Sequence, residues 1–80
     1  MNEQTLQKVY GTILANKEAG GYTIIRAGNK VYFGHHHDYL EQERQHIRKG
    51  LPVAFYINPL EQVPVNKNPH AYMIAIQKGE

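Results

Sequence analysis

The stretch GGYTIIRAGNKVYFGH, residues 20–35, decides the fold of this chain. Its two halves, residues 20–25 and 30–35, are rich in β-branched and aromatic residues, which favour strands. Ala27-Gly28-Asn29 between them is typical of a tight turn. The stretch therefore predicts a β-hairpin with one tyrosine in each strand, Tyr22 and Tyr32.

Alternation along the second strand predicts which side chains of the hairpin face outward. Val31 and Phe33 are expected to face the core, so Tyr32 is expected to face out beside Tyr22. Such a surface suits flat bases of single-stranded nucleic acid, which stack on aromatic rings at roughly 1–3 kcal/mol per base. The alternative is an ordinary cross-strand aromatic pair that stabilises the hairpin.

Three further segments have the composition of strands: residues 9–15, 52–57 and 71–76. In the second of them Val53, Phe55 and Ile57 alternate with smaller or more polar neighbours. Residues 58–69 contain three prolines, which lack the amide proton that a central strand needs. We therefore expect a long loop before the last strand.

One segment is predicted to be helical. Asp38 and Glu41 have the spacing of a capping box, with Asp38 as N-cap and Glu41 at N3. Good helix formers follow, and Gly50 is placed to close the helix before Pro52. We expect two to three turns, with Leu40 and Ile47 on the buried face.

This order of elements predicts an all-β fold. Five antiparallel strands with one short helix between the third and fourth suit a small barrel of the OB type, closed or partly open. Closure also hides the edge strands, which a small β protein must protect.

Composition narrows the class of protein. The chain has 80 residues, no cysteine and a formal net charge of +2, which is compatible with a nucleic-acid partner. Without cysteine, no disulfide or thiolate metal site can stabilise so small a domain. The apolar runs are too short for a membrane span, and residues 1–5 are polar, unlike a signal peptide. We therefore expect one cytoplasmic domain over residues 1–80, with no membrane partner.

The order of several short motifs resembles the cold-shock domain family. Residues 20–25 (GGYTII) are similar to the family's first ribonucleoprotein motif, and residues 31–35 (VYFGH) are similar to the second, Val-Phe-Val-His-Phe. Residues 47–55 (IRKGLPVAF) resemble the segment Leu-Glu-Glu-Gly-Gln-x-Val-x-Phe. Residues 68–71 (NPHA) resemble the Gly-Pro-Gln-Ala entry to the last strand, and Gly11 has the spacing of the opening strand. The similarity spans about residues 8–77.

The resemblance implies an OB barrel that binds single-stranded RNA or DNA, as an RNA chaperone or a regulator of transcription or translation. The implied stacking face carries Tyr22, Ile24, Tyr32 and His35. The implied phosphate contacts around it are Lys17, Arg26, Lys30 and Lys67. The alternative for these four basic residues is an ordinary solvated surface.

Several residues of the family pattern, most of them with rings, are replaced in this chain. The replacements are Ala15 for an exposed Trp, Asn16 for the following Phe, Thr23 for a glycine, Ile24 for an aromatic residue, Gly34 for a histidine and His35 for a Phe. The reduced set of rings motivates an alternative function, a protein-interaction module. Its apolar patch would consist of Leu14, Ile24 and Tyr32.

The run His35-His36-His37 precedes a carboxylate, Asp38. A metal site built on His35, His37 and Asp38 is one interpretation, because zinc and nickel need three or four such ligands. The interpretation we prefer is a polar junction between strand and helix, with His35 stacked on a base or on Tyr32. No catalytic constellation or phosphate-binding glycine motif stands out, so we expect a binding protein that needs no cofactor and is not an enzyme.

Overall fold

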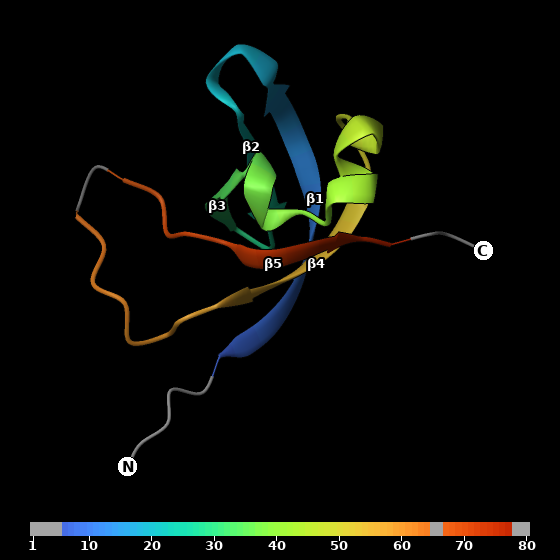
Figure 1. Ribbon diagram of the computed structural model, residues 1–80. Coiled ribbons are helices and arrows are strands. Elements are labelled where there is room, and N and C mark those ends of the chain that lie inside the picture. The colour runs from blue at the N-terminus through green and yellow to red at the C-terminus, as the bar shows by residue number, and fades with distance from the viewer. Residues whose placement is uncertain (1–5, 65–66, 78–80) are drawn as a thin grey trace.

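The computed structural model describes residues 6–64 and 67–77. Five strands form one antiparallel sheet in the order β3-β2-β1-β4-β5 (Figure 1). The strands are β1 (Gln7–Lys17), β2 (Tyr22–Ala27), β3 (Lys30–His35), β4 (Pro52–Ile57) and β5 (Tyr72–Ile76). The prediction of five antiparallel strands is confirmed, and each strand overlaps the segment in which it was expected.

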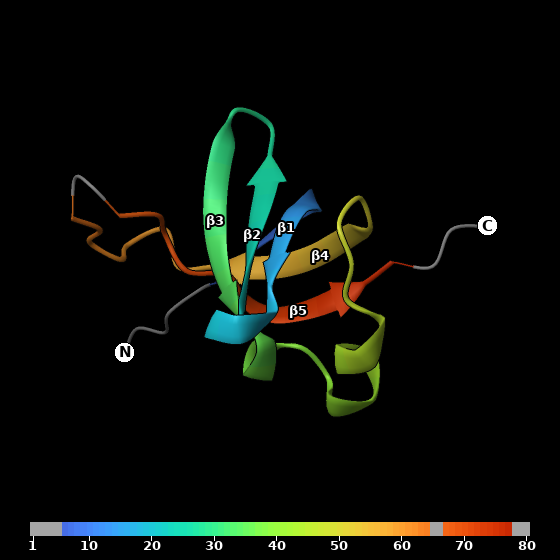
Figure 2. The ribbon, with the colours of Figure 1, turned by 90° about the horizontal axis from the view of Figure 1, so that it is seen from above.

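Strand β1 is long enough to pair with two neighbours. Its second half runs beside β2, ending with Lys17 opposite Tyr22, and its first half runs beside β4. A bulge between Ile13 and Ala15 interrupts the pairing with β2, and bulges of this kind bend a strand and increase its twist. Seen from above, β2 and β3 therefore run across the direction of β4 and β5 (Figure 2).

The outer edge of β3 meets the chain just before β5. The Phe33 N–H donates to the Pro69 carbonyl at 2.8 Å, and the Ala71 N–H donates to the Phe33 carbonyl at 2.9 Å. Two isolated parallel bridges result, Phe33 with His70 and Tyr39 with Ile74. These bridges do not make a continuous ladder, so the sheet is not closed and the predicted barrel is not confirmed.

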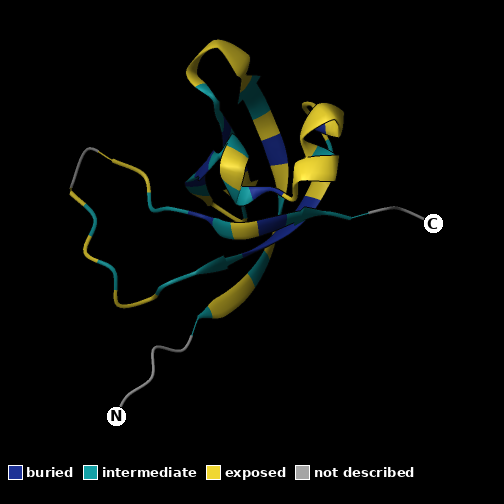
Figure 3. Cartoon of the chain, viewed as in Figure 1, coloured by how far each residue is buried: buried dark blue, intermediate teal, exposed yellow. Residues whose placement is uncertain are grey.

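The core lies between the two bent halves of the sheet (Figure 3). Its largest fully buried side chains are Phe55, Ile13, Ile25, Ile74 and Val53. Thr23 is the one polar residue buried with them among the described residues. The core is small, as expected of a domain of this length.

Tyr32 belongs to this core, so the prediction that it faces out is wrong. It is only 6% exposed and packs against Phe55 with ring centroids 5.1 Å apart. Tyr32 lies opposite the buried Ile25, and directly opposite residues of paired strands share one face of the sheet. Phe33 and Val31 therefore face outward, the reverse of the expected order.

The connection between β3 and β4 is also different from the prediction. It contains two 3₁₀ segments, η2 (His36–Asp38) and η3 (Glu41–His46), in place of one α-helix. Asp38 is the last residue of η2, and neither segment has a side-chain cap, so the capping box with Glu41 is wrong. The cause is Tyr39, whose buried ring and backbone bridge to Ile74 hold the chain extended.

Leu40, next to Tyr39, is extended as well and is 53% exposed, so it does not share a buried face with Ile47. Ile47 itself is buried, as expected. Gly50 follows at a φ of 92°, and its N–H donates to the Ile13 carbonyl at 2.8 Å. The glycine thus ties the end of the connection to β1 rather than closing an α-helix.

The long loop before β5 is confirmed over residues 58–64 and 67–69, which contain no helix or strand. It extends away from the sheet as an arm and returns to it at Pro69 (Figure 1). Over residues 6–64 and 67–77, no helix has the length and apolar character needed to cross a membrane.

Candidate nucleic-acid interface

The outer face of β1, β2 and β3 presents three rows of side chains, set by the cross-strand pairing. Three residues from neighbouring strands share each row because directly opposite residues point to the same side. The rows are Lys17, Tyr22 and His35; Ala15, Ile24 and Phe33; and Thr12, Arg26 and Val31. Two predicted stacking residues, Tyr22 and His35, are thus direct neighbours, and the predicted phosphate contact Lys17 stands beside them.

Phe33 takes the place on this face that the sequence prediction gave to Tyr32. Its ring lies 4.7 Å from that of Tyr22 and meets the His35 ring edge-on at 4.8 Å, measured between centroids. All three residues are only partly buried. Ile24 lies directly opposite Phe33 and supplies an aliphatic neighbour.

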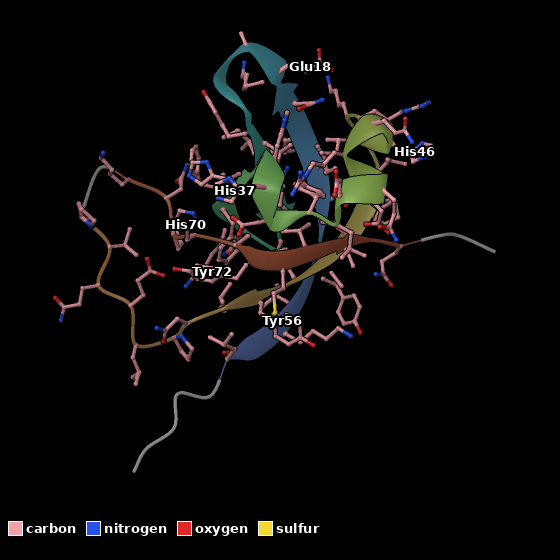
Figure 4. The ribbon with its side chains drawn as sticks, viewed as in Figure 1. Glu18, His37, His46, Tyr56, His70 and Tyr72 are labelled. Carbon is pink, nitrogen blue, oxygen red and sulfur yellow. The ribbon has the colours of Figure 1, made fainter. Side chains whose placement is uncertain are left out.

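The rings continue from this face toward β5. His35 contacts His37 and His70, each at 5.0 Å between centroids, and His70 stacks on Tyr72 at 5.2 Å. His37, His70 and Tyr72 lie together on one side of the molecule (Figure 4). We call the contiguous set of rings the ring cluster: Tyr22, Phe33, His35, His37, His70 and Tyr72.

Local backbone contacts fix the end of the hairpin under the ring cluster. Gly21 has a φ of 73°, which favours glycine, and its N–H donates to the Lys17 carbonyl at 2.9 Å. The His36 N–H in turn donates to the Gly21 carbonyl at 2.9 Å. The His36 ring is engaged by β1, since its Nε2 lies 2.8 Å from the Asn16 Oδ1. His36 therefore has a structural role, whereas its neighbours on both sides supply rings.

A buried hydrogen-bond chain supports the cluster from the core side. The Thr23 hydroxyl donates to the Gly34 carbonyl at 3.1 Å and lies 2.8 Å from the Tyr39 hydroxyl. A threonine hydroxyl has one proton, so the Tyr39 hydroxyl is the donor to Thr23. Burial raises the pKa of Tyr39 to about 12, and the negative charge of Asp38 adds to the rise.

Tyr72, at the far end of the cluster, is held by the long loop. Its hydroxyl donates to the Glu61 carboxylate at 3.2 Å. Burial raises the pKa of Tyr72, and the negative charge of Glu61 raises it further. The loop thus orients a ring of the site through a carboxylate.

The basic residues predicted as phosphate contacts fall into three places. Lys17 and Arg26 stand in the outer rows, and the Arg26 Nε also donates to the Gly28 carbonyl at 3.3 Å. Lys67 lines a groove with Phe33, Asn68 and His70. Lys30, at the start of β3, lines a different groove that Tyr32 and His70 share. The structure therefore places Lys17 beside Tyr22 of the ring cluster and Lys67 in a groove with Phe33 and His70.

The three residues considered as metal ligands do not converge on one point. His35 and His37 stack face to face with an interplanar angle of 11°. The Asp38 Oδ2 lies 4.0 Å from the Nε2 of His70. Within the part of the chain that the structure describes, no three His, Cys, Asp or Glu residues could hold a metal ion.

Sequence reasoning missed four members of the ring cluster: Phe33, His37, His70 and Tyr72. A signal existed for Phe33 in the two-residue turn Gly28-Asn29, because pairing of Ala27 with Lys30 across this turn places Phe33 opposite Ile24. No local signal existed for His70 and Tyr72, because a bridge between residues distant in the sequence brings them to β3.

No protein-family model, curated protein or solved structure matches the chain.

Proposed function

We propose that this protein binds single-stranded RNA or DNA on the ring cluster, by base stacking combined with phosphate contacts. The observation that carries the proposal is the contiguity of Tyr22, Phe33 and His35 on one sheet face, with Lys17 in the same row. Aromatic rings accept any base because every base has a π face, and lysines supply the charge that a phosphate backbone requires.

The strand order supports a partly open OB-type barrel of the cold-shock kind as the scaffold. The bridge between Phe33 and His70 brings the outer edge of β3 to the chain that enters β5. In OB folds the sheet face around the second and third strands binds oligonucleotides. Here β2 and β3 carry three rings of the cluster.

The mechanism is binding alone. It involves no covalent step and no cofactor, and it fits a chaperone or regulator of single-stranded RNA in the cytoplasm. We expect weak sequence preference, since stacking on rings does not read base edges, and a steep loss of affinity with salt.

Fluorescence anisotropy with a labelled oligo-dT and oligo-U at low salt tests the proposal. Tyr22→Ala and Phe33→Ala should each weaken binding by about 5- to 150-fold, which corresponds to roughly 1–3 kcal/mol per lost stack. Tyr22→Phe keeps the ring and should bind as the wild type does. His46→Ala is a matched control, because His46 lies in η3 away from the ring cluster (Figure 4).

The alternative function, a protein-interaction module, loses part of its basis. Its expected patch of Leu14, Ile24 and Tyr32 is incomplete, because Tyr32 is in the core. If neither oligonucleotide binds the wild-type protein at low salt, nucleic-acid binding is refuted and a protein partner becomes the better explanation of the ring cluster.

A further inference from the structure

Three imidazoles meet at one end of the ring cluster. His35 ends β3, His37 lies in η2, and His70 precedes β5. The His35 centroid lies 5.0 Å from that of His37 and 5.0 Å from that of His70. Segments far apart in the sequence thus bring together the side chains whose charge changes most readily between pH 5 and 8.

The ring nitrogens of this group are available for a ligand. Across the described residues, His35 and His37 have no hydrogen-bond partner for their rings, and His70 has only the Asp38 carboxylate at 4.0 Å. His36 is the contrast, since its ring is engaged by Asn16 at 2.8 Å. The ring of His36, which serves the fold, therefore has a hydrogen-bond partner, whereas the ring nitrogens of His35, His37 and His70 can still accept a ligand.

The charges around the three imidazoles favour an anion. Asp38 in η2 is the carboxylate next to them, and the Glu61 carboxylate of the loop accepts the hydrogen bond of Tyr72 in β5. Lys67 and Lys30 line the two grooves that His70 borders, and Tyr22 of β2 lies directly opposite His35. Two carboxylates, Asp38 and Glu61, thus face two lysines and the Arg44 guanidinium, which donates to the His37 carbonyl at 3.4 Å. Fixed positive charges therefore outnumber carboxylates around the group without counting any imidazole.

We propose that His35, His37 and His70 form a phosphate-binding subsite that takes up protons when a nucleic-acid strand binds. The inference rests on the proposed function and adds a ligand and a regulation to it: the ligand is a phosphodiester group of the strand, and the regulator is pH. A phosphodiester anion attracts a protonated imidazole more strongly than a neutral one. Linkage then requires that binding of the strand and protonation of the subsite strengthen each other.

The test measures the affinity of the full chain for labelled oligo-dT between pH 8 and pH 6 at fixed ionic strength. Thymine does not titrate in this range, so any change of affinity with pH comes from the protein. An uptake of one proton per strand strengthens binding by about 10-fold per pH unit. We expect a total gain of about 10-fold between pH 8 and pH 6, which corresponds to a mean uptake of about half a proton over this range. Titration calorimetry in two buffers of different ionisation enthalpy counts the protons directly.

Two variants and a control assign the protons. His37→Asn, at an exposed position that tolerates change, should reduce the slope, and His37→Asn combined with His70→Asn should nearly abolish it. His46→Asn should keep the slope of the wild type. Binding that is measurable but independent of pH, or a slope that survives in the double variant, overturns the subsite and leaves the proposed function intact. An absence of binding at every pH overturns both.

Discussion

The hydrogen-bond chain from Tyr39 through Thr23 to Gly34 allows a sharp prediction about stability. Thr23 and Tyr39 are 0% and 2% exposed, so water cannot replace either hydroxyl's partner. The chain is directional, because Thr23 accepts from Tyr39 and donates to Gly34. Removing one hydroxyl therefore has a different consequence from removing the other.

Thr23→Val should be the more damaging substitution. It removes both hydrogen bonds and leaves the Tyr39 hydroxyl buried without an acceptor, at a cost of about 2–3 kcal/mol. Valine has a similar shape and a high strand propensity, so backbone preference does not cause the loss. Tyr39→Phe leaves Thr23 bonded to Gly34 and should cost about 1 kcal/mol.

The double variant distinguishes this explanation from simple loss of contacts. With both hydroxyls gone, no buried donor is left unpaired. We therefore expect the double variant to lose about 1–2 kcal/mol of unfolding free energy, whereas the two single losses add up to about 3–4 kcal/mol. In the Thr23→Val background, Tyr39→Phe should thus be neutral or stabilising.

Urea unfolding followed by far-UV circular dichroism measures all four proteins of this cycle, since the chain has no tryptophan for fluorescence. The dependence of the free energy on urea should be equal in the four proteins, as expected when only stability changes. If the losses of the two single variants add up to the loss of the double variant within about 0.5 kcal/mol, the inferred hydrogen-bond chain is refuted.

Three further predictions address the same region. Because burial raises the pKa of Tyr39 from 10.0 to about 12, its contribution to stability is complete below pH 10 and is lost as the pH rises toward 12. Urea titrations across this window should show the wild type falling by up to about 3 kcal/mol relative to Tyr39→Phe, and parallel curves would contradict the assignment. Tyr32→Ala should lower the unfolding free energy by about 3–5 kcal/mol, whereas Phe33→Ala should mainly weaken oligonucleotide binding; equal stability losses would contradict the observed register of β3. Gly34→Ala should cost about 1–3 kcal/mol and lower the melting temperature by calorimetry, because the new Cβ would lie 2.5 Å from the Ile74 Cδ1 and 3.2 Å from the Thr23 Oγ1; an unchanged melting temperature would show that Ile74 moves aside freely.

The strands of this fold could be predicted from the sequence because local signals specify them. The turn at Gly28, the alternation through Phe55 and the prolines of the long loop all act within a few residues. The strand β4 was predicted with its observed bounds, Pro52–Ile57. Local patterns of this kind report strand existence reliably because the side-chain period of two is intrinsic to the extended chain.

The face of β3 could not be predicted from β3 alone. Val31, Tyr32 and Phe33 are all apolar or aromatic, so the strand has no clear alternation and either phase is compatible with burial. The pairing with β2 decides the phase, since Ile25 must be buried and lies opposite Tyr32. A one-residue difference in the phase of β3 thus places Tyr32, the ring expected at the candidate site, in the core, and places Phe33 at the site.

The helical prediction failed for a related reason. Asp38 and Glu41 satisfy the sequence pattern of a capping box, but Tyr39 between them is required by the core. Its backbone bridge to Ile74 needs an extended conformation, and the energy of burying an aromatic ring exceeds that of a helix cap. Local propensity was overridden by a contact that no local pattern reveals.

The same backbone contact completes both the fold and the candidate site. A β3 edge without a partner would expose unpaired amide groups and invite association with other chains. Pairing of Phe33 with Pro69 and Ala71 covers that edge, and it also places His70 beside Phe33 and His35. His70 and Tyr72 therefore join the ring cluster only when Phe33 makes this backbone contact. Because of this dependence, any substitution that opens the Phe33 bridge should lower the unfolding free energy and weaken oligonucleotide binding together. Loss of an exposed ring such as His37 should weaken binding alone.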